Sequence, residues 1–511
     1  MPIVNRKNIF TTGFDQDALI ITKPGTNLLN LGDLTTTGDR ADGIFADANN
    51  VTIRNNAKIE TAGDGAAGIL VHGNDAHVEN FGSITTHGSV FTSKKVQFFS
   101  EAIDVEGDRF YIANHGAIRV EGAESSAIIG EGAGGTIINA GTVYSAAAGG
   151  IAIFAFSEGA QIINTGQVTV ANDRIFAIST GPRDGHEVNQ GSIDITGDHT
   201  LGMLGLGDRA QIENFGTIET HGTHAIGIEG LGGHLFPEGD NIKIINAGHI
   251  TTEGNVAIGV ALGLPIIPPG TATDASILNT GVIETHGDGA AGVVMIGEGN
   301  RLTNSGLITT NGANFEEDSI GLLHAAGVVV SGDGMLVENT AAGVILSQDA
   351  ASAAVELNVV HRGGLANAGI ASHVENFGLI EGAEVAILGG DGLETIINHG
   401  HIVGDVILGD GNDTFVFGNG GSLDGGLFLG GGKDLVVIEN GAGVAEIADF
   451  SAGSSNKDVI DVSIFYSSFE QLASNIHQVA NDVVITLDAD DQLVLRNTLT
   501  GALSASDFLL V

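Results

Sequence analysis

A short phrase that recurs along the chain limits the possible folds more than any other feature of the sequence. Its clearest copy is IENFGTIETHG at residues 212–222, and its core is Asn-x-Gly-x-Ile-x-Thr-x-Gly. The Asn recurs fourteen times, most often 25 residues apart. A fixed period of this length is typical of solenoids, in which each repeat is one structural unit. The repeated Asn residues are Asn30, Asn55, Asn80, Asn114, Asn139, Asn164, Asn189, Asn214, Asn246, Asn279, Asn304, Asn339, Asn376 and Asn398.

Each repeat predicts three short strands separated by three corners. The Ile and Thr of the phrase are two residues apart, so both point to the same side of one strand. A second strand resembles residues 225–228 (AIGI), and a third, such as residues 210–213, leads to the next Asn. Three strands in about 25 residues predict one turn of a parallel β-helix, with neighbouring coils ~4.8 Å apart. We therefore predict an all-β chain with a parallel β-helix over residues 30–384, behind an N-terminal cap at residues 1–29.

The repeated Asn and Thr residues are predicted to be structural. Stacked Asn side chains form ladders in which one amide bonds the next. Inward Thr hydroxyls are expected to bond from strand to strand. Because these residues recur in nearly every coil, we expect function where the phrase is interrupted.

Five insertions interrupt the 25-residue period. Two follow the first glycine corner of a coil, at residues 89–100 and 313–324, and three lie at the second corner, at residues 229–240, 261–273 and 357–371. Insertions on one face of a repeat protein often form its binding surface. Two of them belong to adjacent coils and predict an exposed apolar patch for a partner or for self-assembly. The residues of this predicted patch are Leu235, Phe236, Leu264, Ile266 and Ile267.

The charge and composition exclude several partners. With 62 acidic and 19 basic residues, the net charge of −43 opposes binding to nucleic acid or anionic membranes and favours contact with divalent cations. No apolar run reaches the ~18 residues of a membrane span. The first residues lack the apolar core of a signal peptide, and the chain has no Cys for disulfides.

Three glycine-rich turns replace the phrase toward the C-terminus, at residues 390–394, 409–413 and 430–434. Calcium takes six to eight oxygen ligands from carboxylates and backbone carbonyls. Glycine at alternate positions exposes carbonyls, and an acidic residue follows two positions after the last glycine. Stacking such turns one coil apart predicts calcium sites between them. The predicted metal-site residues are Gly390, Gly392, Glu394, Gly409, Asp410, Gly411, Asp413, Gly430, Gly432 and Asp434.

These turns largely follow the nonapeptide G-G-x-G-x-D-x-U-x, although the copy at Gly409 lacks the first Gly and Glu394 replaces the Asp. Residues ~385–511 therefore resemble the C-terminal part of RTX (hemolysin-type calcium-binding) proteins. The blocks IADFSAGSSNKDVIDVS and ANDVVITLD and the last five residues resemble the end of type I secretion substrates such as the serralysin group. The resemblance implies a calcium-binding β-roll at residues 385–440 and an uncleaved secretion signal within residues 441–511. It also implies export by the type I secretion machinery and folding outside the cell. The serralysin protease motif H-E-x-x-H is absent.

Within the C-terminal region, residues 467–478 (SSFEQLASNIHQ) predict a helix. Ser467 is the expected N-cap, with Glu470 completing a capping box. Phe469, Leu472 and Ile476 would form its apolar face. Two strands are expected near residues 483–487 and 493–495.

The function that these features favour is that of a secreted or cell-surface structural or adhesive β-solenoid, such as a surface-layer, matrix or filament component. Its expected partners are further copies of itself or a bacterial cell surface or polysaccharide. A polysaccharide lyase, hydrolase or epimerase is the alternative, although basic residues are scarce and Trp is absent. His87, His221 and His286 share one coil position but lie in coils that are not adjacent, so they cannot form one site. Ice binding is a minor alternative, because charged residues interrupt the outward Thr column.

Overall fold

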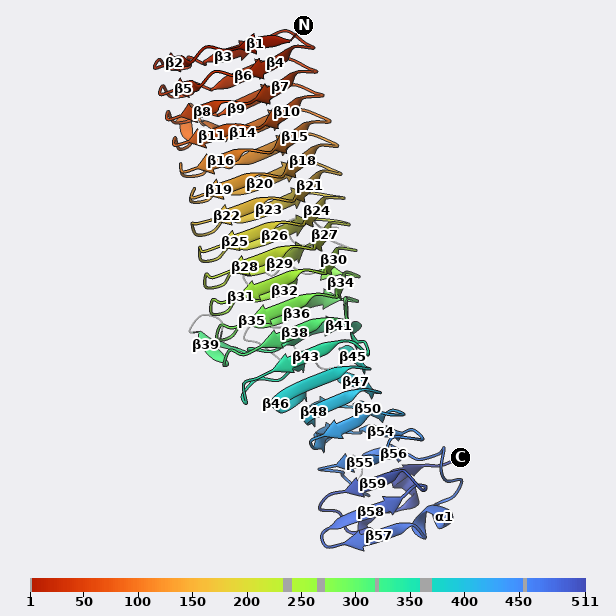
Figure 1. Cartoon of the computed structure of the whole chain (residues 1–511). Coiled ribbons are helices and arrows are strands. Elements are labelled where there is room, and N and C mark those ends of the chain that lie inside the picture. Colours follow the sequence, from red (N-terminus) through yellow and green to blue (C-terminus); the bar gives the residue numbers. More distant parts are fainter. Residues whose placement is uncertain (1, 233–240, 264–271, 318–320, 359–369, 454–456) are drawn as a thin grey trace. The chain divides into compact units, whose positions relative to one another are not determined.

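The computed structural model describes residues 2–232, 241–263, 272–317, 321–358, 370–453 and 457–511. The chain forms two compact units, Met1–Ala261 and Leu262–Val511, and each is described by itself. Both units are built from stacked parallel strands (Figure 1). No helix of the described chain is long and apolar enough to cross a membrane.

The first unit is a parallel β-helix with three strands in each coil, which we number as faces 1, 2 and 3. Face 1 contains β1 (Ile3–Asn5), β4 (Asn27–Asn30), β7 (Thr52–Asn55), β10 (His77–Asn80), β15 (Tyr111–Asn114), β18 (Thr136–Asn139), β21 (Gln161–Asn164), β24 (His186–Asn189), β27 (Gln211–Asn214) and β30 (Lys243–Asn246). Face 2 contains β2 (Ile9–Thr11), β5 (Leu34–Thr36), β8 (Lys58–Thr61), β11 (Ser83–Thr86), β16 (Ala117–Val120), β19 (Thr142–Ser145), β22 (Gln167–Val170), β25 (Ser192–Ile195), β28 (Thr217–Thr220) and β31 (His249–Thr252). Face 3 contains β3 (Leu19–Ile21), β6 (Ile44–Asp47), β9 (Ile69–His72), β14 (Ile103–Glu106), β17 (Ile128–Glu131), β20 (Ile151–Phe156), β23 (Phe176–Gly181), β26 (Leu201–Leu206) and β29 (Ile226–Leu231).

Every strand of a face pairs in parallel with the equivalent strand of the next coil, and the repeat unit sets the register. Asn139 of β18 lies opposite Asn164 of β21, and Val143 of β19 lies opposite Val168 of β22. An insertion leaves the register unchanged, because Ile84 of β11 still pairs with Ile118 of β16 across residues 89–100. The predicted parallel β-helix is therefore confirmed. Residues 1–29, predicted as a cap, hold β1 to β3 and pair with the next coil in the same register.

The apolar columns of the phrase form the core. The face 2 residues Ile59, Ile84 and Ile218 are completely buried. Burying one such side chain is worth about 1.5–3 kcal/mol relative to leaving it exposed. The glycine that ends the phrase is required by the close approach of coils: a Cβ at Gly222 would overlap the carbonyl oxygen of Gly197 in the preceding coil.

The Asn column forms the predicted ladder at the end of face 1. Each buried Asn donates from Nδ2 to Oδ1 of the next Asn at 2.8–2.9 Å, from Asn5 to Asn246 in the first unit. The second unit repeats it from Asn279 to Asn398 at 2.9 Å. An amide both donates and accepts, so one residue type can continue the chain of bonds indefinitely.

The Thr column differs from its prediction. Thr36, Thr86 and Thr220 are buried, and their hydroxyls have no hydrogen-bond partner among the described residues. Thr61 instead donates to the carbonyl of Ala66 at the adjoining corner, at 3.0 Å. The predicted strand-to-strand bonds are therefore absent for Thr36, Thr86 and Thr220, because backbone pairing keeps the coils too far apart for one Thr hydroxyl to reach the next. Thr310 does bond between coils, since it donates to the carbonyl of Ala290 in the preceding coil at 3.3 Å.

In the second unit the coil changes its shape along the chain. Its face 1 strands are β34 (Ser276–Asn279), β37 (Arg301–Asn304), β42 (Met335–Asn339), β45 (Ala371–Asn376), β47 (Leu393–Asn398), β50 (Thr414–Phe417), β54 (Leu435–Ile438), β56 (Val459–Asp461) and β60 (Phe508–Leu509). Its first coils keep face 2 in β35 (Val282–Thr285), β38 (Leu307–Thr310) and β43 (Val344–Ser347), and face 3 in β36 (Ala291–Glu298), β41 (Val328–Asp333) and β44 (Val355–Leu357). The single strand β46 (Leu379–Leu388) then pairs with both β43 and β44. Merging two strands removes a corner, which explains why the coils after Asn376 are shorter than 25 residues.

The C-terminal region ends in an antiparallel meander. It contains α1 (Phe469–Ala473), β57 (Ile476–Val479), β58 (Asp482–Thr486) and β59 (Gln492–Leu495). The predicted helix is therefore shorter than expected, and its N-cap is Ser468, whose side chain accepts from the backbone of Gln471. Ile476 leaves the helix because it pairs with Ile485 in β58. Sheet pairing across the chain here overrides the local helix preference.

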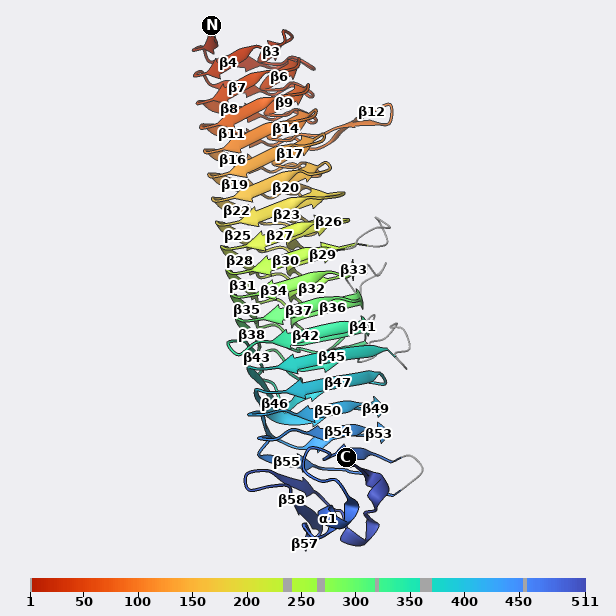
Figure 2. The same ribbon diagram turned by 90° about the vertical axis from the view of Figure 1, so that its right-hand side faces the viewer.

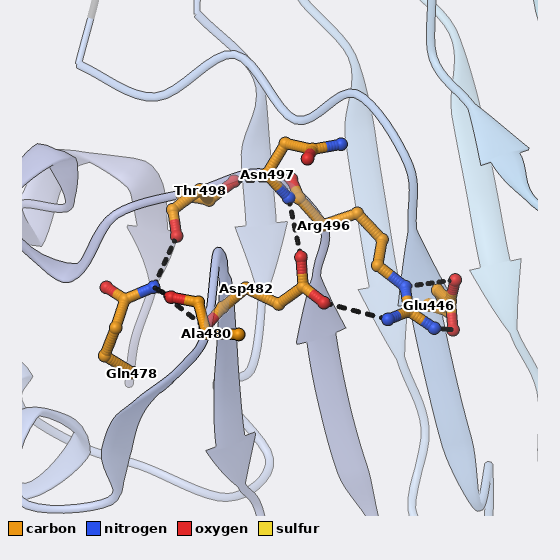
Figure 3. Close-up of polar contacts among 7 residues, drawn as sticks. All are labelled: Glu446, Gln478, Ala480, Asp482, Arg496, Asn497 and Thr498. Atoms are coloured by element: carbon orange, nitrogen blue, oxygen red, sulfur yellow. Dashed lines mark hydrogen bonds and ion pairs between the residues drawn. The ribbon is translucent and has the colours of Figure 1, made fainter.

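One arginine joins this meander to the β-helix (Figure 3). Arg496, which directly follows β59, makes two hydrogen bonds to Glu446 of β55 (Val444–Ile447), at 2.5 and 2.7 Å, and a third to Asp482 of β58 at 2.8 Å. The fork of the guanidinium suits this bidentate pairing. Asp482 also accepts from the backbone of Asn497, at 2.9 Å, so three strands meet at one charge cluster.

The Asn ladder predicts a specific sensitivity to mutation. Asn164 accepts from Asn139 and donates to Asn189, both at 2.8 Å. Asn164→Ala would remove one hydrogen bond from each of the buried amides of Asn139 and Asn189, so we expect the free energy of unfolding to fall by about 2–3 kcal/mol. Urea unfolding followed by circular dichroism measures this. Gln190→Ala, at the exposed position that follows Asn189 in the next coil, is the matched control, and equal losses for the two variants would contradict a stabilising ladder.

Candidate functional site

Four acidic side chains from successive coils form a buried column in the second unit, at the start of the face 1 strands. Glu394, Asp413, Asp434 and Asp458 are each at most 3% exposed. The backbone N–H of Glu394 donates to Asp413 at 2.8 Å, and that of Asp413 donates to Asp434 at 2.9 Å. The backbone N–H of Asp434 reaches Asp458 at 3.3 Å. Each carboxylate therefore caps the strand of the coil before it. We call these four residues the acid column.

The acid column has more acceptor oxygens than donors. Oε2 of Glu394, Oδ2 of Asp413 and Oδ2 of Asp434 are buried and have no hydrogen-bond partner among the described residues. A carboxylate that is ionised can only accept hydrogen bonds, so a second carboxylate cannot satisfy it. Neighbouring members of the column therefore need a shared proton or a bound cation between them.

Burial raises the pKa values of the column. Loss of solvent raises the pKa of Asp413 to about 8 and that of Asp434 to about 7, and the neighbouring acids add to both shifts. The pKa values of Glu394 and Asp458 are also raised, mainly by burial. In the absence of a cation, Asp413 therefore keeps its proton at neutral pH, and Asp434 is partly protonated there.

The predicted glycines form two stacked columns beside the acids. Gly390, Gly409 and Gly430 lie one above the other, and the backbone N–H of Asp410 donates to the carbonyl of Gly390 at 2.8 Å. Gly392, Gly411 and Gly432 stack likewise (Figure 1 shows the strands β47, β50 and β54 that they precede). A Cβ at Gly411 or Gly432 would overlap the carbonyl oxygen of the glycine one coil earlier. The close approach of backbones thus requires glycine at these positions.

The structure brings most of the predicted metal-site residues together, but Asp410 lies at the edge of the site. Glu394, Asp413 and Asp434 point into the column, whereas Asp410 is exposed beside the stacked glycines. Lys433 is exposed, and its backbone N–H donates to Asn412 at 2.9 Å. The predicted apolar patch of Leu235, Phe236, Leu264, Ile266 and Ile267 lies outside the described residues.

Sequence reasoning missed two members of the site. Asn358 is buried above the column and donates to Glu394 at 3.1 Å. Asp458 continues the column below Asp434, although no glycine turn precedes it. Asp458-Val459-Ile460 repeats the acid-x-apolar order of Asp413 and Asp434, and this pattern was the available signal.

The side chains of the acid column supply only some of the oxygen ligands that a divalent cation needs. Within the described ranges, no group of three or more His, Asp or Glu side chains converges to hold a metal ion. A cation in the column would take the free oxygens of two successive acids and complete its shell with carbonyl oxygens of the glycine turns. Calcium accepts such mixed carboxylate and carbonyl ligands, so the residues present fit it.

The histidines at the equivalent coil position are held by acids. His87 contacts Glu121 at 2.7 Å and Glu60 at 3.3 Å, and His221 contacts Glu253 at 2.7 Å and Asp194 at 3.4 Å. Each of these histidines thus joins three successive coils. The hydrogen bond that His221 donates to the Glu253 carboxylate raises the pKa of His221. These pairs account for the two histidines as surface contacts between coils.

Comparison with known proteins identifies the β-helix. The family model for the BigA third pectate lyase-like domain matches residues 3–175 and, in a second copy, residues 150–343. The two matches overlap and together cover more than half of the chain, as expected for a repeating coil. No curated protein matches the sequence.

The acid column predicts that stability depends on pH when calcium is absent. Unfolded Asp413 releases its proton near pH ~3.9, whereas the folded residue keeps it until about pH 8. The folded state therefore binds more protons within this window, and its stability falls as pH rises through it. We expect the melting temperature of the second unit in EDTA to be lower at pH 8 than at pH 5. Circular dichroism measures this.

Asp413→Asn should reduce the difference between the melting temperatures at pH 5 and pH 8 in EDTA, because the amide does not titrate. Glu384→Gln, an exposed carboxylate of the same unit, is the matched control and should leave the difference unchanged. A wild-type melting temperature that rises from pH 5 to pH 8 in EDTA would overturn the assignment of raised pKa values to this column.

Proposed function

The chain belongs to the family of the BigA third pectate lyase-like domain, and from this premise we propose that it is an extracellular structural or adhesive β-solenoid whose C-terminal coils bind calcium. The single observation that carries the calcium proposal is the acid column with its free, buried oxygens on Glu394, Asp413 and Asp434. Buried carboxylates without partners are costly, and a divalent cation offsets that cost.

Calcium would supply positive charge between successive coils. Asp413 lies between Glu394 and Asp434, so its free oxygen is available to an ion shared with either neighbour. The remaining ligands would be backbone carbonyls of the stacked glycine turns. In this arrangement the ion stabilises the last coils by joining them, which is a structural role rather than a catalytic one.

The proposed location follows from the same chemistry. Calcium is plentiful outside cells and scarce in the cytosol, so the acid column would be protonated or repelled before export and filled afterwards. The resemblance of the C-terminal region to RTX proteins supports passage through the type I secretion machinery. The net charge of −43 also favours an unfolded, soluble chain while calcium is low.

The adhesive or structural role is supported by the regular coils. Strands that repeat in register over a long chain present wide, continuous faces, as extended solenoids do in binding. The expected partners stay those predicted from sequence: further copies of the chain, or a bacterial cell surface or polysaccharide.

A polysaccharide-modifying enzyme is the second candidate, because the matched family is described as pectate lyase-like. Incubation with pectin or alginate should yield no unsaturated or reducing ends if the chain is structural. If the wild type released such ends, and a variant with one acidic residue substituted did not, the result would favour the enzyme instead.

Calcium binding is tested by unfolding with and without the ion. We expect calcium to raise the stability of the second unit, by about 2.7 kcal/mol per site at a concentration one hundred times the Kd. The double variant Asp413→Asn/Asp434→Asn should lose this gain. Isothermal titration calorimetry gives the affinity and the number of ions, and circular dichroism gives the stability.

Glu381→Gln/Glu384→Gln removes the same charge from exposed positions of the same unit and is the matched control. It should keep the full response to calcium. If calcium stabilises neither the wild type nor the control, or stabilises all three proteins equally, the acid column is not a calcium site.

A further inference from the structure

Face 3 of the first unit carries acidic and aromatic side chains at adjoining outward positions. Strand pairing aligns Asp104 of β14 with Ile129 of β17, and Ile129 with Phe154 of β20. The next outward positions align Glu106 with Glu131, and Glu131 with Phe156. We call this set the face 3 patch: Asp104, Glu106, Ile129, Glu131, Phe154 and Phe156.

The face 3 patch has more acidic side chains than there are basic side chains of this chain paired with them. His72 pairs with Glu106 at 3.4 Å, but Asp104 and Glu131 have no ion pair among the described residues. Oδ1 of Asp104 is buried without a hydrogen-bond partner. The neighbouring Glu101 is only 4% exposed. The structure thus holds a buried, unsatisfied acceptor inside a group of like charges.

Burial, followed by the negative charges around it, raises the pKa of Asp104. The acids that contribute are Glu101, Glu106, Glu131 and Asp42. A positive group on this face would relieve both the repulsion and the missing hydrogen bond.

The apolar half of the patch lies directly beside the acids. The rings of Phe154 and Phe156 are 5.6 Å apart, and Phe156 is 46% exposed. Ile129, between Asp104 and Phe154, is half-exposed. Exposed aromatic rings next to unpaired carboxylates suit a ligand that is both apolar and cationic.

A protruding hairpin borders this face. The strands β12 (Phe91–Ser93) and β13 (Val96–Phe98) pair antiparallel in the insertion that immediately precedes β14. The hairpin projects away from the coils in Figure 2. A Cβ at Gly65 would contact both Phe91 and Phe98, so the base of the hairpin packs closely on the coil. Each face 3 strand runs from the first corner of its coil to the second corner. Insertions at either corner therefore border face 3.

Aromatic rings beside the carboxylates suit an organic cation better than a bare metal ion. Lys and Arg side chains lay their aliphatic stems on apolar surface and extend their charged ends to carboxylates. A stem on Ile129 and Phe154 would place its charge toward Asp104 or Glu131.

We propose that the face 3 patch binds an extended segment of a partner protein that carries lysine or arginine beside apolar residues. Charge complementarity selects this partner, since the patch is acidic and the whole chain is strongly acidic. The proposal adds a partner class to the adhesive role and does not depend on calcium, because the acid column belongs to the other unit.

The test measures binding of a fluorescein-labelled peptide, acetyl-Lys-Leu-Lys-Leu-Lys-Leu-amide, by fluorescence anisotropy in 0.15 M NaCl with the full chain. We expect Asp104→Asn/Glu131→Gln to weaken binding by about tenfold, as expected for loss of close charge pairs. Phe154→Ala/Phe156→Ala should also weaken it. Glu131→Gln alone, at an exposed position, keeps the test valid if the Asp104 variant fails to fold.

Glu213→Gln/Glu219→Gln removes the same charge from faces 1 and 2 of the same unit and should change the Kd by less than about twofold. An equal loss for both charge variants would mean diffuse attraction to an acidic protein and would overturn the proposal. Absence of binding would overturn it as well. A chitosan oligomer that binds more tightly than the peptide, with the same dependence on Asp104 and Glu131, would assign the patch to amino-sugar polymers instead.

Discussion

Pairing between one coil and the next is the interaction on which the rest of the structure depends. Every face 1, 2 and 3 strand of the first unit finds its partner in the coil before or after it, so no coil is stable alone. The pairing places equivalent residues directly above one another. Asn164 therefore meets Asn139 and Asn189, and Gly222 meets Gly197. A residue that can hydrogen-bond to another copy of itself can recur in every coil. A residue that cannot do so leaves a column of polar groups without hydrogen-bond partners.

The two polar columns of the chain illustrate this rule. An Asn amide donates to the amide below and accepts from the one above, so the Asn ladder is neutral and complete. In the acid column the backbone N–H groups satisfy only one oxygen of Asp413 and one oxygen of Asp434. The second oxygens of Asp413 and Asp434 keep no partner. The same stacking that completes an amide ladder thus concentrates charge when the residue is an acid.

Face 3 of the first unit shows what stacking does where the sequence does not repeat. Its inward positions stay apolar, but its outward positions change from Leu70 to Asp104, Ile129 and Phe154 in four successive coils. The core of the β-helix requires only the inward residues, so the outward residues can vary from coil to coil and form a surface. Insertions at the corners then border that surface without disturbing the register, as the pairing across residues 89–100 demonstrates.

The sequence by itself determined the parallel β-helix, the Asn ladder and the position of the glycine turns, because each depends on a period that the residues carry. It did not determine where Thr hydroxyls bond, where α1 ends, or that Asp458 joins the acid column. Ile476 leaves the predicted helix only because Ile485 pairs with it, and Asp458 reaches the column only through the pairing of β54 with β56. Asp104 and Phe154 lie two coils apart, on either side of Ile129, so their place on one face follows from the 25-residue period. The pairing of Ile476 with Ile485 and of β54 with β56 follows no period, so only the tertiary structure decided these contacts.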